Sequence, residues 1–143
     1  MHSVALIHAA SVEQVLYVLD STVLIDYLRN RPAVQRVNAM QPRGDVPATT
    51  AINVEEVVRG LRSEENDTAK RLLEGLVVLP LDGEVGWLAG EWRRDFASRG
   101  VTLGQADCLV AAATLRAGAT LATGNPEDFP MTGLDVQHWP VGA

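Results

Sequence analysis

The chain has 143 residues and a mass of 15.4 kDa, with a formal net charge of −6 and a pI near 4.9. This length suits one domain with a buried core, and the 47% apolar composition excludes a disordered chain. Cys108 is the single cysteine, which excludes an internal disulfide framework and a cysteine-rich zinc site. No apolar run approaches the length of a membrane span, and the N-terminus lacks the basic residues of a signal peptide. We therefore expect a cytoplasmic protein with no membrane association.

The basic residues are unusual in kind, because eleven of the 12 are arginine and the other is Lys70. Arginine makes planar, bidentate contacts to phosphate, whereas lysine presents a point charge. The acidic balance argues against a nucleic-acid partner. Acids committed to a metal ion would, however, neutralise part of that balance. The net charge therefore decides neither for nor against nucleic acid.

Residues 15–19 form a short, continuous apolar run, which predicts a strand buried on both faces. From Thr22 the apolar spacing becomes helical, and Ser21 or Thr22 is well placed as the helix N-cap. Asp20 therefore lies at the carboxyl end of a buried strand, at the turn into a helix. In open α/β sheets this is the edge where ligands bind.

Strands and helices alternate along the rest of the chain. The predicted strands are 46–49, 77–81, 119–123 and an edge strand at 134–138, and the predicted helices are 32–41, 50–61, 63–76 capped by Ser63, 83–99 capped by Asp82, and 105–117. Turns are predicted at 42–45, 100–104 and 124–130. This alternation indicates right-handed βαβ crossovers. The fold class is therefore α/β, with a central, mostly parallel sheet of four or five strands flanked by helices, formed by residues 15–143. Residues 1–14 form an N-terminal extension to which no role is assigned.

Three further acids occupy positions that also have an ordinary structural explanation. Asp107 lies in the first turn of the 105–117 helix, where caps and partners for the helix dipole are common. Asp128 follows the fourth strand, where turn residues are common. Glu56 lies within the 50–61 helix, where a capping box with Asn53 or a solvent-exposed face is the ordinary explanation. Taken singly, these positions leave structural and functional roles open.

Glu55 and Glu56 are distinguished by their neighbours on the helix. Glu55 has Arg59 four residues later, which is the favourable order for an exposed ion pair. Glu56 has Ile52 and Gly60 at the same spacing, so its side of the helix is apolar and closely packed. We therefore expect Glu56 to point inward, where a carboxylate needs a cation or a hydrogen-bond donor.

Three segments together resemble a known family. They are LDSTVLIDYL, AINVEEVVRG and QADCLVAAATLRAGATLATGNPEDF, in the order and at the spacings of the PIN-domain nucleases, and most closely of the VapC toxins of bacterial toxin–antitoxin pairs. The resemblance covers residues 16–136. It implies a PIN-like, Rossmann-like three-layer fold and an endoribonuclease that cuts RNA, often tRNA, to leave a 5′-phosphate.

The resemblance also implies roles for individual residues. The catalytic and metal-binding set that it implies is Asp20, Glu56, Asp107 and Asp128. The residues that it places around this set, as support for the metal or contacts for the substrate, are Ser21, Thr22, Asp26 and Asn125. Asn125 stands where many relatives carry Asp, so Asp128 would serve as the fourth acid, and the number of metal ions stays open.

The chemistry of these residues agrees with the resemblance. Carboxylates without His or Cys form a hard-oxygen site that suits Mg²⁺ or Mn²⁺. A divalent cation lowers the pKa of bound water and so supplies a nucleophile for phosphodiester hydrolysis. The resemblance further implies a homodimer and a VapB-type antitoxin, which would lie across helices near the first motif and place a basic side chain in the acidic pocket.

Two other classes of protein remain open from the sequence. One is another Asp-dependent α/β protein, either a phosphohydrolase of the haloacid dehalogenase type or a receiver domain. The phosphohydrolase expects a second Asp where Thr22 stands, and the receiver domain expects a lysine after a late strand, whereas Lys70 lies on a predicted helix. The other class is a catalytically silent PIN-fold interaction module, in which the acids accept a partner's arginine. The presence of all four acids favours the nuclease.

Overall fold

The computed structural model describes residues 14–142, so the predicted N-terminal extension lies almost wholly outside the described residues. Strands and helices alternate, as the sequence predicts. The elements are β1 (Leu16–Leu19), α2 (Ser21–Leu28), α3 (Ala33–Arg43), β2 (Val46–Thr50), α4 (Ala51–Arg59), the 3₁₀ turn η1 (Ser63–Glu65), α5 (Asn66–Glu74), β3 (Val77–Leu79), α6 (Gly83–Ser98), α7 (Gln105–Arg116), β4 (Thr120–Thr123), the 3₁₀ turn η2 (Pro126–Asp128) and β5 (Asp135–His138). No helix in this part of the chain is long and apolar enough to cross a membrane.

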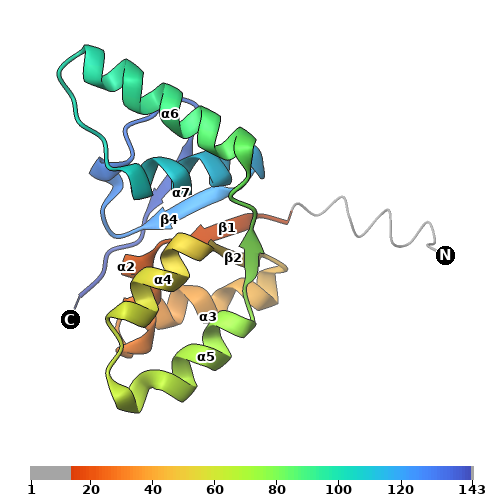
Figure 1. The fold of residues 1–143 in the computed structure, drawn as a ribbon. Coiled ribbons are helices and arrows are strands. Elements are labelled where there is room, and N and C mark those ends of the chain that lie inside the picture. The colour runs from red at the N-terminus through yellow and green to blue at the C-terminus, as the bar shows by residue number, and fades with distance from the viewer. Residues whose placement is uncertain (1–13, 143) are drawn as a thin grey trace, which may run out of the picture.

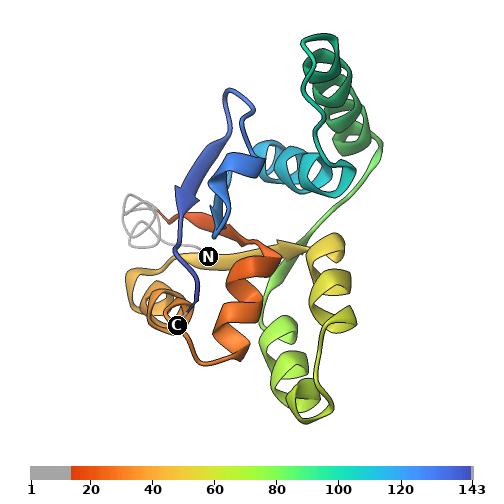
Figure 2. The ribbon, with the colours of Figure 1, turned by 90° about the vertical axis from the view of Figure 1, so that its left-hand side faces the viewer.

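The sheet has five strands in the order β3-β2-β1-β4-β5, and every neighbouring pair is parallel. From the central β1 the chain winds outward through β2 and β3 in one direction and through β4 and β5 in the other. The strand order therefore reverses beside β1, which is where open α/β sheets bind ligands. Strands β1 and β4 point toward the side of the molecule that holds the C-terminus (Figure 1), and Figure 2 looks onto that side.

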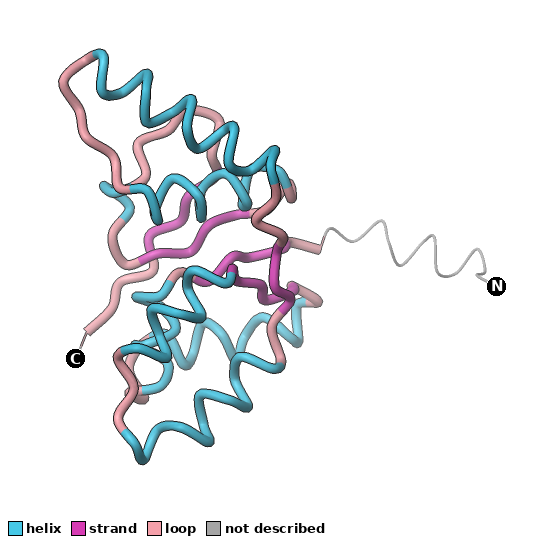
Figure 3. Tube along the Cα trace, in the orientation of Figure 1, coloured by secondary structure: helices cyan, strands magenta, loops and turns pink. Residues whose placement is uncertain are grey.

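Helices cover both faces of the sheet. Helices α2, α3, α4 and α5 lie on one face, and α6 and α7 lie on the other (Figure 1 and Figure 3). Alternate side chains of β1 serve the two layers, because Val18 packs into the core under α7 while Leu19 packs with Leu24 and Met40 on the other face. All four of these side chains except Met40, at 1%, are completely buried. The prediction of a first strand buried on both faces is confirmed.

Two predicted helix caps are wrong. Helix α2 is capped by Asp20 itself, whose Oδ1 accepts a hydrogen bond from the Ser21 backbone N at 2.8 Å, rather than by Ser21 or Thr22. The predicted 63–76 helix is split into η1 and α5, and Ser63 makes no cap hydrogen bond. There the Glu65 carboxylate turns back to accept from the Arg62 backbone N at 2.9 Å, and this local hydrogen bond favours a tight 3₁₀ turn. The predicted Asp82 cap of α6 is confirmed.

Helix α3 runs past the predicted turn at Pro42. Pro42 has no backbone N–H to donate to the carbonyl of Asn38, and only Arg43 follows it before the helix ends. The helix ends at Gly44, which adopts a φ of +77°. The following Asp45 N donates to Met40 O at 3.0 Å, which closes the helix in the manner of a Schellman motif. The turn therefore begins two residues later than predicted.

Candidate active site

The Asp20 carboxylate forms the floor of the site and is 8% exposed. Its Oδ1 accepts hydrogen bonds from the Ser21 backbone N at 2.8 Å and from Asn53 Nδ2 at 3.2 Å. Its Oδ2 accepts from Thr123 Oγ1 at 2.7 Å and from Thr22 Oγ1 at 3.3 Å. All four donors are neutral, so they orient the carboxylate without neutralising its charge. Burial nevertheless raises the pKa of Asp20 above its ordinary value.

A short hydrogen-bond network links Asp20 to Glu56. Thr50 Oγ1 donates to Asn53 Oδ1 at 2.8 Å, which fixes the Asn53 amide so that its Nδ2 faces Asp20 and Ser21. Ser21 Oγ accepts from Asn53 Nδ2 at 3.0 Å and donates to Glu56 Oε1 at 2.5 Å. The N-terminal turns of α2 and α4 therefore hold both acids through neutral side chains.

The prediction that separates Glu55 from Glu56 is confirmed. Glu56 is half-buried and points at Ser21, whereas the Glu55 side chain is 63% exposed. The Glu55 carboxylate pairs with Arg59 at 3.9 Å along the helix. The capping box between Glu56 and Asn53 does not form, because Thr50 caps α4 and accepts from the Asn53 backbone N.

Asp107 lies in the first turn of α7 and is half-buried. A side chain at Gly104 would crowd it, because a Cβ there would lie 3.2 Å from Asp107 Oδ2. Burial, with repulsion from Asp128, Asp20 and Glu56, raises the pKa of Asp107 to about 6. No hydrogen bond or cation from residues 14–142 offsets this rise. The Asp107 carboxylate therefore belongs to a group of four acids rather than to the cap of its own helix.

The loop after β4 forms the exposed rim of the site. Asp128 ends the 3₁₀ turn η2, and the Asp128 backbone N donates to Asn125 O at 3.1 Å. The Asn125 backbone N donates to Thr123 Oγ1 at 3.0 Å, and the Gly124 backbone N donates to Thr22 Oγ1 at 2.9 Å. These hydrogen bonds tie the loop to β4 and α2. Asp128 and Asn125 are both exposed to solvent.

The structure does not bring Asp26 into this group. Asp26 is 3% exposed, and its two oxygens accept from the backbone N of Ala33 and of Gly142, each at 2.9 Å. Its position six residues along α2 turns its side chain toward the start of α3 and the C-terminal segment. Asp26 therefore joins three parts of the backbone. By contrast, Ser21 and Thr22 do lie around Asp20, as expected.

Sequence reasoning missed Asn53, Thr50 and Thr123 as parts of the site. Thr123 ends β4, and β4 pairs with β1 in a register that sets Leu19 opposite Ala122. Thr123 therefore lies beside Asp20, which also donates its backbone N to Ala122 O at 3.0 Å. Asn53 lies three residues before Glu56 on the inward side of α4. The position of Thr123 would have been predictable from the two strand ends, had the pairing of β1 with β4 been known.

The donor chemistry of the four acids fits a hydrated divalent cation. Within residues 14–142, no three His, Cys, Asp or Glu side chains converge closely enough to hold a metal ion directly as they stand. The Asp107 carboxylate does lie within electrostatic reach of the other three. Mg²⁺ commonly keeps several waters and is held by one or two carboxylates. Asp20 is buried, Glu56 and Asp107 are half-buried, and Asp128 is exposed. This all-oxygen set suits an ion of this kind.

Comparison with known proteins gives concordant matches. Residues 17–132 match the family model described as the PIN domain. The chain is 32% identical over 127 residues to Ribonuclease VapC10 of Mycobacterium tuberculosis, covering 88% of this chain and 87% of the relative. It is 26% identical over 132 residues to Ribonuclease VapC1 of Haemophilus influenzae, covering 87% and 98%. The structure of VapBC-1 from nontypeable Haemophilus influenzae matches with a TM-score of 0.73 at 26% identity, covering 87% of this chain and 98% of that one.

The pKa of Asp107 predicts a stability difference that depends on pH. The folded protein holds the Asp107 proton up to about pH 6, whereas the unfolded chain releases it near 3.8, so the free energy of unfolding falls as pH rises through this window. Asp107→Asn removes the ionisation. In EDTA at pH 7.5 we expect the variant to melt a few degrees above the wild type, with the two melting temperatures converging near pH 4.

Glu55→Gln is the matched control, because Glu55 is exposed and lies in a simple ion pair with Arg59. Its melting temperature should follow that of the wild type at both pH values. Thermal unfolding by circular dichroism measures all three proteins. If the melting temperature of Asp107→Asn differs from that of the wild type by the same amount at pH 4 and at pH 7.5, repulsion between Asp107 and the other three acids is ruled out.

Proposed function

The chain belongs to the PIN-domain family and to its VapC ribonucleases, the toxins of VapBC toxin–antitoxin systems, and from this premise we propose that it is a metal-dependent endoribonuclease. The observation that carries the proposal is the group of four carboxylates at the carboxyl edge of the sheet. Their mutual repulsion has no compensating cation among residues 14–142. A site of this charge favours the binding of a divalent metal ion.

We propose Mg²⁺ or Mn²⁺ as the cofactor. When bound, such an ion lowers the pKa of water for attack on a phosphodiester and neutralises developing negative charge. Asp20, Glu56 and Asp107 would hold the ion directly or through water. Asp128, on the exposed rim, would hold a second ion or orient water. Ser21 and Thr22 keep the Asp20 carboxylate in place, and Ser21 also fixes Glu56.

The proposed substrate is RNA, with tRNA as the class to test first. Two relatives carry the name ribonuclease, which supports RNA as the polymer. Hydrolysis at this site would leave a 5′-phosphate. Asn125 and Asp128 are exposed, so an RNA strand could contact the rim of the site from solvent.

The proposed protein partner is a VapB-type antitoxin. A solved complex that resembles this chain, VapBC-1 of Haemophilus influenzae, supports such a partner. The four carboxylates offer the antitoxin a site for a basic side chain, which would exclude both metal and RNA. Because this contact is between charges, the inhibition should weaken as the salt concentration rises.

We also propose a homodimer, formed at the β3 edge of the sheet. Strand β3 lies at an edge of the sheet, so its outer backbone groups are available to pair with another chain. Several large hydrophobic side chains on β3 and on the elements before and after it in the sequence are exposed. They are Val58 on α4, Val77 and Val78 on β3, Leu81, and Trp87 on α6. Trp87 is 72% exposed, which is a strong departure from the usual burial of tryptophan.

The nuclease proposal is tested by incubating the purified protein with total tRNA in Mg²⁺, Mn²⁺ or EDTA, with products read on a denaturing gel. We expect discrete fragments from the wild type only when metal is present. Asp107→Asn and Glu56→Gln should each lower the cleavage rate by about 10²-fold or more, because each removes a carboxylate from the metal site.

The matched control is Glu55→Gln, the same change one residue away on the exposed side of α4, which should alter the rate less than about twofold. A large loss in Glu55→Gln with little loss in Glu56→Gln would show that the wrong side of α4 had been chosen. No cleavage of any RNA by folded, antitoxin-free wild type would favour the catalytically silent interaction module.

The dimer proposal is tested by size-exclusion chromatography with light scattering. The wild type should elute at twice the chain mass, and the double variant Trp87→Ser, Val78→Thr should dissociate to the mass of one chain. Val101→Ser is the matched control, since Val101 is exposed in the loop between α6 and α7. A wild-type protein that is monomeric at high concentration, or a dimer that the double variant leaves intact, would contradict this assignment.

A further inference from the structure

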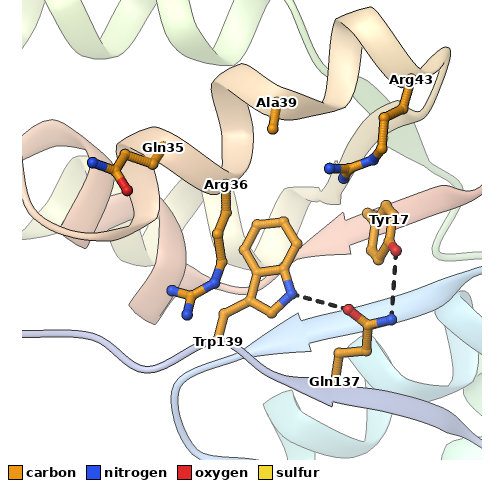
Figure 4. A pocket seen from close by; sticks show the side chains of 7 residues that line it. All are labelled: Tyr17, Gln35, Arg36, Ala39, Arg43, Gln137 and Trp139. Carbon is orange, nitrogen blue, oxygen red and sulfur yellow. Dashed lines mark hydrogen bonds between the residues drawn. The ribbon is translucent and has the colours of Figure 1, made fainter.

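A pocket away from the four acids lies on the opposite side of β4 and β5 from α7, between α3 and the sheet. Its volume is about 320 Å³. Tyr17 on β1 and Trp139 after β5 form its floor, with their ring centroids 5.6 Å apart. Two guanidinium groups, Arg36 and Arg43, reach from α3 toward this floor (Figure 4).

Hydrogen bonds join the side chains that form the floor of the pocket. Trp139 Nε1 donates to Gln137 Oε1 at 3.1 Å, and Gln137 Nε2 donates to the Tyr17 hydroxyl oxygen at 3.4 Å (Figure 4). Tyr17 is 8% exposed and Trp139 is 5% exposed. The rings therefore offer little surface for stacking a base. The Tyr17 hydroxyl accepts this hydrogen bond and donates none to the other described residues, so its O–H is available to a ligand.

The pocket carries surplus positive charge in a chain whose net charge is −6. Arg43 Nε pairs with Asp45 Oδ2 at 3.0 Å, and the other Asp45 oxygen accepts from the Val15 backbone N. Arg36 has no carboxylate within 4.0 Å among residues 14–142, and its Nη1 donates to Pro140 O at 3.4 Å. Two guanidinium groups therefore face the pocket against one nearby carboxylate, and most of their N–H donors are unused within the described residues.

The four acids Asp20, Glu56, Asp107 and Asp128 are called the acid cluster below. Two hydrogen bonds, both made by Thr123, link the pocket to this cluster. The Trp139 backbone N donates to Thr123 O at 2.8 Å, and the Thr123 hydroxyl donates to Asp20 at 2.7 Å. Beyond Trp139 the chain packs against the rim loop, because a Cβ at Gly124 would lie 2.8 Å from a Val141 methyl group. A strand lying across the acid cluster would pass over this short segment to reach Arg36.

We propose that the Arg36–Arg43 pocket is a subsite for a phosphate of the RNA strand, remote from the bond that is cut. This inference rests on the proposed function, since it takes RNA as the ligand. The acid cluster repels phosphate, so the affinity for RNA has to come from cations outside it. The forked donors of arginine match phosphate oxygens in pairs, and the Tyr17 hydroxyl adds a neutral donor. Arg36 and Arg43 are positioning residues in this account, because they touch RNA away from the reacting atoms.

The test measures binding rather than cleavage, so it does not depend on the nuclease activity. The Asp107→Asn protein, in EDTA, is titrated against a short fluorescein-labelled single-stranded RNA of mixed sequence, and anisotropy is followed at several salt concentrations. Adding Arg36→Gln or Arg43→Gln should weaken binding by about five- to tenfold and reduce the slope of log affinity against log salt by roughly 0.7 for each phosphate that is no longer bound. Arg36→Lys keeps the positive charge but loses the forked donors of the guanidinium group. Its affinity for RNA should lie between that of the parent protein and that of Arg36→Gln.

Arg71→Gln is the matched control, because it removes one charge from the exposed surface of α5 and should change the affinity less than about twofold. Circular dichroism verifies that each variant is folded. Equal weakening by Arg36→Gln and Arg71→Gln would overturn the proposal, since it would show a general charge effect. Unchanged RNA binding by Arg36→Gln, together with abolished binding of the antitoxin, would also overturn it and assign the pocket to a protein carboxylate.

Free nucleotide is distinguished from RNA by a second titration. Adenosine 5′-monophosphate is added to the same protein, and the Trp139 indole N–H resonance, assigned with Trp139→Phe, is followed by NMR. A shift that disappears in Arg36→Gln, accompanied by weaker RNA binding, supports a subsite for RNA phosphate. The same shift with RNA affinity unchanged would assign the pocket to a free nucleotide and overturn the RNA subsite.

Discussion

The structure depends on one constraint, which is that the buried Asp20 carboxylate must be supplied with hydrogen bonds without being neutralised. Its four donors come from α2, α4 and β4, so the ends of β1 and β4 and the first turn of α4 have to meet at one point. A buried carboxylate without these donors would be strongly destabilising. The same donors are neutral, which leaves the full negative charge available to a ligand. The parallel sheet provides this arrangement, because its strands all end at the same edge.

Repulsion among the carboxylates of the acid cluster destabilises the folded protein and favours the binding of a cation. Asp107 is half-buried beside three other carboxylates, and its pKa of about 6 reports that ionisation is unfavourable there. Protein sites that accept such a conflict are commonly functional. A divalent cation would convert the repulsion into attraction, and a basic side chain of the proposed antitoxin would have the same electrostatic effect. One arrangement of acids therefore explains how catalysis and inhibition would use the same place.

The elements and the acids were predictable from the sequence because both leave local patterns. The apolar run before Asp20 and the change to helical spacing after it located the first strand end. The pairing of Glu55 with Arg59 identified the inward direction of Glu56. Asn53 and Thr123 were not predictable, because their roles depend on contacts with Asp20 across 33 and 103 residues of chain. Asp26 shows the reverse error, since a carboxylate in the first motif was expected near the site and instead binds backbone N–H groups of Ala33 and Gly142.

The central claim is that the four carboxylates together bind a divalent cation. Electron paramagnetic resonance of Mn²⁺ tests it most directly, because the free ion is measured without any need for substrate. The account predicts that wild type and Glu55→Gln bind Mn²⁺ equally, and that Asp107→Asn binds at least about tenfold more weakly. Asp107 accepts no hydrogen bond from residues 14–142, so this variant leaves the supporting network intact. Equal Mn²⁺ binding by wild type and Asp107→Asn would contradict the account.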